Sequence, residues 1–206
     1  MVKVNKKYKD RLFRMVFNRK EELLSLYNAI SHSEYTNPEE LEINTLDDVI
    51  YMKMKNDLAF LIDDVLNLWE HQSTWNPNMP VRGTLYIVEE YRKYIEQNGL
   101  NLYGSRLITL PIPQFYVFYN GLKEEPDYIE LKLSDAFSRV HSELEPCMEF
   151  KAIMMNINRG HNEGLMKQCS TLREYAEFVA RIRERTKDRT ALGTAVEDVM
   201  DSCIRN

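Results

Sequence analysis

Two carboxylates and an amide lie at one end of a segment whose pattern predicts a β-hairpin. If Asp63 and Asp64 are the central residues of a two-residue turn, the numbers of paired positions sum to 127, so Asp57 lies opposite Glu70. Side chains alternate along a strand, and Gln72 therefore shares the face of Glu70. The spacing thus predicts a small cluster of oxygen atoms at the open end of the hairpin.

Such a cluster suits a hard divalent cation. Mg²⁺ takes one or two protein carboxylates together with waters and substrate phosphate oxygens. A cation of this kind could activate water for hydrolysis of a phosphodiester. We therefore expect a Mg²⁺ or Mn²⁺ site with Asp57 and Glu70 as the metal ligands. The same register puts Lys55 opposite Gln72.

The rest of the hairpin is apolar on both faces, which predicts a buried, central pair of strands. Leu58, Phe60 and Trp69 fall on one face, and Ala59 and Leu68 fall on the other. Acidic residues at the end of such a pair are costly unless a metal or another cation compensates their charge. Two alternatives stay open. The acidic residues could be strand-end residues that face water, and a slip of one residue would place them on opposite faces.

An acidic residue before a strand, a tight turn and then Glu-x-Gln resembles the PD-(D/E)XK nuclease superfamily, with glutamine in place of the usual lysine. Longer blocks narrow the resemblance to the Rpn family of recombination-promoting nucleases and transposase-like proteins. The blocks occur in the family's order and cover most of the chain: DRLFRMVF (10–17), EHQS (70–73), NPNMPVRG (76–83), LPIPQFYVFYNG (110–121) and MNIN (155–158).

This resemblance implies an α/β fold with a PD-(D/E)XK restriction-endonuclease-like core, in which helices flank a central mixed β-sheet and a helical segment follows. The implied activity is metal-dependent cleavage of DNA by an endonuclease, associated with recombination or mobile elements in the bacterial cytoplasm. The chain could form a homodimer. The alternative is a catalytically inactive nuclease-fold module that binds DNA or another protein.

The catalytic roles follow from the chemistry of each side chain. Asp57 and Glu70 would hold the metal, and Gln72 would orient the attacking water or the phosphate. An amide cannot supply positive charge, so Lys55 would provide it if charge is needed there. Asp10 matches a family position in the first helix and would be an accessory carboxylate.

Composition bounds the class of protein. The chain has 206 residues, of which 44% are hydrophobic and 29% charged, enough for one sizeable core in a single domain over residues 1–206. No apolar run approaches a membrane span, and the N-terminus lacks the apolar stretch of a signal peptide, so we expect a cytoplasmic protein without a membrane partner. Cys147, Cys169 and Cys203 lack metal-site spacing and are expected to be reduced core residues.

Basic residues are concentrated at the N-terminus. The first twenty residues carry a charge of +7, whereas the whole chain carries −5. Either phosphate contacts or a solvated helix face would explain this segment. The residues expected to contact DNA are Lys6, Lys7, Lys9, Arg11 and Arg82. A second basic run over 181–189 is interleaved with acids and is better explained as a solvated helix face.

Hydrophobic spacing and breaker residues predict the elements that position these groups. Two short helices over 8–31, separated near Asn18 and Arg19, precede a sheet core over about 41–158, with extended segments at 49–54 and 57–62. A helix is expected from Pro80 to about Gln97, followed by strands at 114–119, 128–133 and 149–157. Helices follow over about 160–206, one of them capped by a capping box at 171–174.

Overall fold

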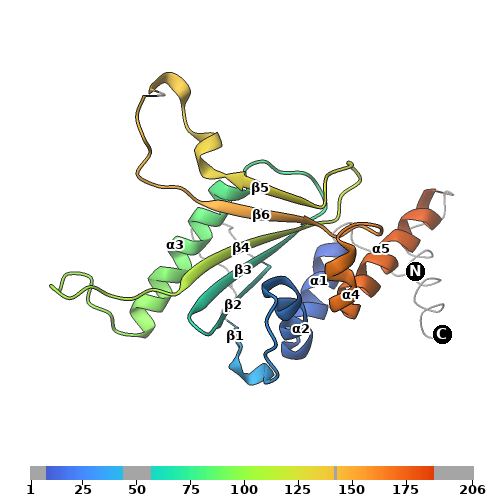
Figure 1. Ribbon diagram of the computed structural model, residues 1–206, viewed down its shortest axis with the longest axis horizontal. Coiled ribbons are helices and arrows are strands. Elements are labelled where there is room, and N and C mark those ends of the chain that lie inside the picture. The colour runs from blue at the N-terminus through green and yellow to red at the C-terminus, as the bar shows by residue number, and fades with distance from the viewer. Residues whose placement is uncertain (1–7, 44–56, 142, 188–206) are drawn as a thin grey trace.

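The computed structural model describes residues 8–43, 57–141 and 143–187 and shows an α/β arrangement around one six-stranded mixed sheet (Figure 1). The order of the strands is β1–β2–β3–β4–β6–β5. Their bounds are β1 Glu42–Ile43, β2 Leu58–Ile62, β3 Val65–Gln72, β4 Ile112–Tyr119, β5 Tyr128–Lys132 and β6 Lys151–Asn156. The sheet is open, and helices lie on both of its faces.

The predicted hairpin register is confirmed. β2 and β3 pair antiparallel with Leu58 opposite Trp69 and Ile62 opposite Val65, so every pair sums to 127. Asp63 and Asp64 make the turn with φ values of 48° and 62°. Two consecutive left-handed residues are what a type I′ turn requires, and aspartate tolerates that conformation better than most residues do. The one-residue slip is thereby excluded.

The three parallel strands end level with one another. β3 pairs parallel with β4, and β4 pairs parallel with β6, so that Gln72, Tyr119 and Asn156 stand side by side at the carboxyl edge. β4 begins at Ile112 and includes Pro113, earlier than expected. Proline fits there because β6 pairs with β4 only from Tyr116 onward, which leaves one side of Pro113 without a strand partner.

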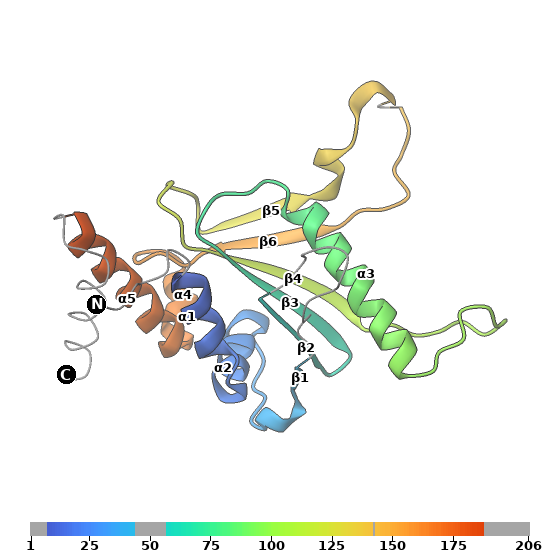
Figure 2. The same cartoon turned by 180° about the vertical axis from the view of Figure 1, so that it is seen from behind.

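The two faces of the sheet carry separate cores. Helices α1 (Tyr8–Phe17), α2 (Lys20–Ser31), α4 (Glu163–Gln168) and α5 (Ser170–Lys187) contribute to the core that includes Phe60 and Trp69. Helix α3 (Met79–Gln97) covers the opposite face, where Ala59 and Leu68 are buried (Figure 2). The apolar alternation of the hairpin was therefore predicted correctly, since each set of residues enters one of the two cores.

The helices agree with the sequence analysis in place, but not in every detail. α1 and α2 are separated at residues 18–19, and α3 runs to Gln97, just before Gly99 adopts φ +59°. The predicted capping box is wrong, because α5 begins at Ser170 and Thr171 is already inside the helix. Short 3-10 helices occur at η1 (Pro38–Glu40), η2 (Leu133–Ala136) and η3 (Arg139–His141).

The cysteines, the segment at 49–54 and the hydropathy of the helices were also subjects of prediction. Cys169 is buried, but Cys147 is exposed, so the expectation that it is a core residue is wrong. Cys203 and the extended segment at 49–54 lie outside the described residues. Within the described part of the chain, every helix is too short or too polar to cross a membrane.

Candidate metal and catalytic site

The hairpin brings Asp57 and Glu70 together at its open end. Asp57 immediately precedes β2, and continuing the β2–β3 register by one residue sets it opposite Glu70. The two carboxyl groups interact: Glu70 lowers the pKa of Asp57, and Asp57 raises that of Glu70. The Asp57 side chain is 15% exposed and Glu70 is 3% exposed. These values exclude the alternative in which the two acids simply face water.

Asp57 also contacts a backbone N–H of β3 and a side chain of α1. Its Oδ2 accepts a hydrogen bond of 2.8 Å from the backbone N–H of His71. The guanidinium of Arg14, on α1, lies 4.0 Å from Asp57 Oδ1. Asp57 is therefore tied to strand β3 by one carboxylate oxygen and faces a cation with the other.

Burial controls the protonation of the carboxyl pair. Desolvation raises the pKa of Asp57 above its usual value, and hydrogen bonds from His71 and Glu70 only partly oppose this effect. Desolvation raises the pKa of Glu70 well above its usual value, and the neighbouring charge of Asp57 adds to the rise. A charged Asp57 therefore makes ionisation of Glu70 harder, because one site cannot easily hold two negative charges.

Helix α3 supplies two partners for Glu70, and the spacing of residues in the sequence predicted neither contact. Arg82 Nη2 lies 3.0 Å from Glu70 Oε1, and the Tyr86 hydroxyl is hydrogen-bonded to Glu70. Arg82 Nε and Nη2 also donate to that hydroxyl, at 3.2 and 2.7 Å. Residues four apart on a helix share one face, so α3 presents both groups to β3 together.

Gln72 lies on the same face of β3 as Glu70, because side chains alternate along a strand. Gln72 is the last residue of β3 and is half-buried, two positions after Glu70. Its backbone carbonyl accepts a hydrogen bond of 2.8 Å from the N–H of Asn120, which fixes the end of the strand. Lys55, expected opposite Gln72, lies outside the described residues.

Asp10 and His71 lie on the opposite face from Glu70. His71 Nδ1 is 2.8 Å from Asp10 Oδ1, and His71 packs against Phe13 in the core beneath α1. His71 thus points away from Glu70, as the strand alternation predicts. The structure places Asp10 against the ring of His71 and not beside Asp57 and Glu70.

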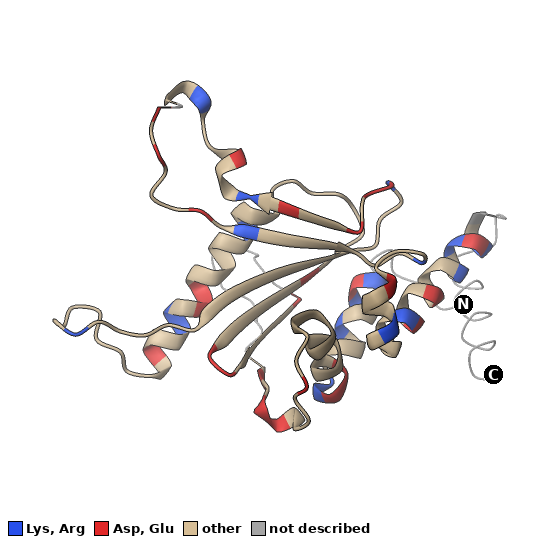
Figure 3. Cartoon of the chain, viewed as in Figure 1, with Lys and Arg blue, Asp and Glu red and all other residues tan. Residues whose placement is uncertain are grey.

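Many of the described basic residues pair with acids of the same chain, and Figure 3 shows Lys and Arg interspersed with Asp and Glu on the helices. Lys9 is half-buried, and burial together with nearby Arg183 lowers the pKa of Lys9 to about 8. Lys20 lies 2.7 Å from Glu39, whereas Arg11 is exposed on α1. Lys6 and Lys7 lie outside the described residues. Of the three residues expected to contact DNA that the structure describes, Lys9, Arg11 and Arg82, Arg11 is the exposed one.

The basic run on α5 is only partly a solvated face. Arg181 pairs with Glu177 at 2.8 Å, as expected for a helix surface. Arg183 instead donates to Asn120 Oδ1 at 2.8 Å and to Asn158 Oδ1 at 2.6 Å. The interpretation as a solvated face is therefore wrong for Arg183, which joins α5 to the carboxyl edge of the sheet.

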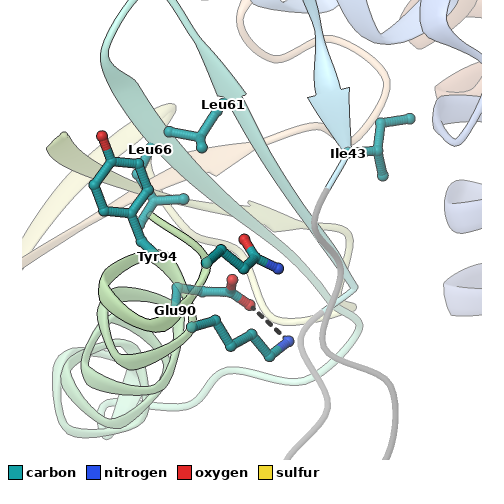
Figure 4. Close-up of a pocket in the computed structure, with 7 residues that line it drawn as sticks. Ile43, Leu61, Leu66, Glu90 and Tyr94 are labelled. Atoms are coloured by element: carbon teal, nitrogen blue, oxygen red, sulfur yellow. Dashed lines mark ion pairs between the residues drawn. The ribbon is translucent and has the colours of Figure 1, made fainter. Parts of the chain in front are cut away.

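A separate cavity of about 260 Å³ lies between α3 and the β1–β2 edge (Figure 4). Its lining includes Glu90, which is 3% exposed, and Lys93, whose Nζ lies 3.8 Å from Glu90 Oε1. Leu61 and Leu66 form part of the wall. Asp57 and Glu70 are not among the lining residues, so this cavity is distinct from the carboxyl pair.

Across the described residues, no three His, Cys, Asp or Glu side chains gather closely enough to enclose a metal ion by themselves. The chain matches no protein-family model, and comparison with curated proteins and with solved structures finds no match.

Proposed function

We propose that this protein is a metal-dependent deoxyribonuclease, with Asp57 and Glu70 holding Mg²⁺ or Mn²⁺ in a PD-(D/E)XK-like core. The observation that carries the proposal is the buried carboxyl pair, placed opposite one another by the β2–β3 register at the carboxyl edge of parallel strands. Ligands of open α/β sheets commonly bind at that edge. The sequence blocks that resemble the Rpn family include Glu70 and Gln72.

The donor set fits a hard divalent cation. Burial raises the pKa of both carboxyl groups, and the charge of Asp57 raises that of Glu70 further. A bound dication would favour the charged forms of both groups. Mg²⁺ also accepts few protein ligands and keeps several waters, so two carboxylates suffice. When bound, such a metal polarises the scissile phosphate and lowers the pKa of a coordinated water.

The chain's own residues prepare the site for this chemistry. Arg82 and Tyr86 hold Glu70 from the α3 side, and the His71 N–H holds Asp57. The Arg82 side chain is 33% exposed, which leaves its guanidinium able to contact a phosphate while it contacts Glu70. Gln72 would orient the attacking water through its amide.

One observation favours the alternative of a nuclease-fold module without catalysis. The guanidinium of Arg82 already compensates the charge of Glu70 at 3.0 Å, and residue 72 is an amide where the superfamily usually has lysine. A site neutralised in this way could bind a DNA backbone without cutting it. The two functions differ in one measurable respect, cleavage that depends on a divalent metal.

Plasmid cleavage by the purified full chain tests the proposal. We expect nicking or cutting with Mg²⁺ or Mn²⁺ and none with excess chelator. Asp57→Asn and Glu70→Gln should each lower the rate by at least about 100-fold, because losing a ligand exceeds the 10–100-fold effect of losing an outer-shell partner. Glu90→Gln is the matched control, since Glu90 is equally buried but lies in the separate cavity, and it should cut like the parent.

The outcomes of this assay separate the two functions. Metal-dependent cutting that Glu70→Gln abolishes supports the nuclease. DNA binding without cutting under all metal conditions supports the inactive module. Cutting that persists at the parental rate in both Asp57→Asn and Glu70→Gln would place the active site elsewhere in the chain.

DNA association should depend on the N-terminal basic segment. Replacing Lys3, Lys6 and Lys7 with glutamine should weaken binding about equally for all DNA sequences. The slope of the logarithm of the affinity against the logarithm of the salt concentration should also become shallower. We expect a change of about 0.9 for each phosphate that the variant no longer neutralises. Arg11→Gln is the complementary variant, because Arg11 is exposed on α1. A salt slope that is unchanged in all of these variants would locate the phosphate-binding residues elsewhere.

A further inference from the structure

A buried histidine connects three distant segments directly behind the carboxyl pair. The side chain of His71 is fully buried on β3. Its Nδ1 meets Asp10 Oδ1 of α1 at 2.8 Å, and its Nε2 meets the hydroxyl of Tyr175 of α5 at 2.8 Å. The Asp10 carboxylate accepts, so Nδ1 donates to it, and a second hydrogen bond joins Nε2 to the Tyr175 hydroxyl.

The helix that carries Tyr175 is itself fixed to the same edge of the sheet. Arg183, two turns further along α5, donates to Asn120 just after β4 and to Asn158 just after β6. The Tyr175 hydroxyl also reaches the backbone carbonyl of Lys9 at 3.3 Å. The ring of His71 is therefore held between two helices that are both anchored to the fold.

The backbone of His71 joins this support to the carboxyl pair. Its N–H donates to Asp57 Oδ2 at 2.8 Å, and that N–H belongs to the peptide bond that follows Glu70. Fixing the ring on one face of β3 thus fixes the peptide that aims a hydrogen bond at Asp57. It also fixes the strand backbone that carries Glu70 to the other face.

We infer that His71 is a positioning residue for Asp57 and Glu70, with Asp10 and Tyr175 as the supports that orient it. This inference rests on the proposed function, in which the carboxyl pair holds the metal. Hydrogen-bond partners behind metal ligands commonly change metal affinity or activity by about 10–100-fold when they are removed. The ring of His71 does not contact Asp57 or Glu70. A loss of metal affinity on changing the ring would therefore show that His71 positions the ligands and is not a ligand itself.

Titration of the purified full chain with Mn²⁺, by calorimetry, tests the inference. Tyr175→Phe removes one hydrogen bond and keeps the ring, and we expect the affinity for Mn²⁺ to fall by about 10-fold. His71→Leu removes both ring contacts and should lower the affinity further. His71→Asn can still donate to Asp10 from a position close to that of Nδ1, so it should bind Mn²⁺ more tightly than His71→Leu.

A matched control separates positioning from general stability. Val179 is fully buried on α5 one turn beyond Tyr175, so Val179→Ala should lower the melting temperature at least as much as Tyr175→Phe. Val179→Ala should nevertheless bind Mn²⁺ like the parent. Equal losses of affinity in Val179→Ala and Tyr175→Phe would overturn the inference, since loosening α5 alone would then explain both.

Exchange of the His71 backbone amide gives a readout that does not need the metal. Tyr175→Phe should speed exchange of this N–H several-fold relative to Val179→Ala, because the ring support for its hydrogen bond to Asp57 is weakened. An unchanged exchange rate overturns the positioning role, whether or not Mn²⁺ binds. Faster exchange in Tyr175→Phe, together with a parent that shows no Mn²⁺ binding, retains the positioning of Asp57 and refutes the proposed function instead.

Discussion

Two buried glutamates on the α3 side of the molecule have the same exposure but different surroundings. Glu70 on β3 and Glu90 on α3 are each 3% exposed, and burial raises the pKa of both. Around Glu70, Asp57, Arg82 and Tyr86 all make direct contacts. Around Glu90, Lys93 is the nearest cation at 3.8 Å, and Glu90 Oε1 is buried without a hydrogen-bond partner among the described residues.

This difference shows that a raised pKa is not by itself evidence of a functional site. The pKa of both glutamates is raised for the same physical reason, the loss of water around a carboxylate. Groups from the hairpin and from α3 converge on Glu70, and the carboxyl group of Asp57 is one of them. Convergence of polar groups, together with the perturbed pKa, is what makes Glu70 the better candidate.

The largest stability effect should come from removing the cation beside Glu70. Arg82→Leu leaves a buried carboxylate without its partner, which costs about 3–5 kcal/mol in fully buried pairs. Arg82 is 33% exposed, so we expect a loss of about 2–3 kcal/mol in the free energy of unfolding at pH 8. Urea denaturation at several pH values measures this loss.

The pH dependence of that loss gives a second check. The pKa of Glu70 is already raised, and removing Arg82 raises it further, because the guanidinium favours the charged form. Once Glu70 is protonated it no longer needs a cation, so the loss should shrink as the pH falls. Arg92→Leu, on an exposed part of the same helix, is the control and should leave stability almost unchanged at any pH. An equal loss in both variants would show that the Glu70–Arg82 pair is unimportant.

The local geometry of the site could be predicted from sequence because it depends on short-range rules. Asp63 and Asp64 suit a turn with two left-handed residues, and that turn sets the pairing of every residue in the hairpin. The opposite orientations of Glu70 and His71 then follow from strand alternation. Pro80 and Gly99 likewise marked the start and end of α3 within a residue or two.

The partners of these residues could not be predicted, because they depend on how helices pack on the sheet. Arg82 is recognisable as a residue at the start of a helix, but its contact with Glu70 requires the docking of α3 on β3. The contact between His71 and Tyr175 joins residues 104 positions apart, and no spacing rule reaches that far. Asp10 was expected either to bridge the metal or to lie behind its ligands, and only the packing of α1 shows that it contacts His71.

A smaller effect is expected at Glu90, whose ion-pair partner Lys93 lies 3.8 Å away. The pKa of Glu90 is about 7 in the folded protein and near 4.5 in the unfolded chain, so the folded state binds more protons between these values. Stability must then fall as the pH rises from about 4.5 to 7. Glu90→Gln removes this loss, and its advantage over the parent should grow across that range to about 1–2 kcal/mol, allowing for solvent in the cavity.

Denaturation of the parent and of Glu90→Gln at pH 5 and pH 8 measures this advantage. A constant difference between the two proteins at both pH values would mean that Glu90 does not titrate in this range. Loss of metal-dependent cleavage in Glu90→Gln would contradict the comparison more seriously, because it would give the separate cavity a part in the activity.

The smallest effect is expected from Lys93→Met, the counterpart of Arg82→Leu. Lys93 is 30% exposed, and its Nζ lies 3.8 Å from Glu90 Oε1, beyond hydrogen-bond distance, so the variant should lose less than about 1 kcal/mol. Lys93 lowers the pKa of Glu90, so its removal should shift the pH-dependent fall in stability to higher pH. The same denaturation series measures both quantities. A loss as large as that in Arg82→Leu would mean that the two glutamates are held equally, and Glu70 would lose the distinction on which its assignment rests.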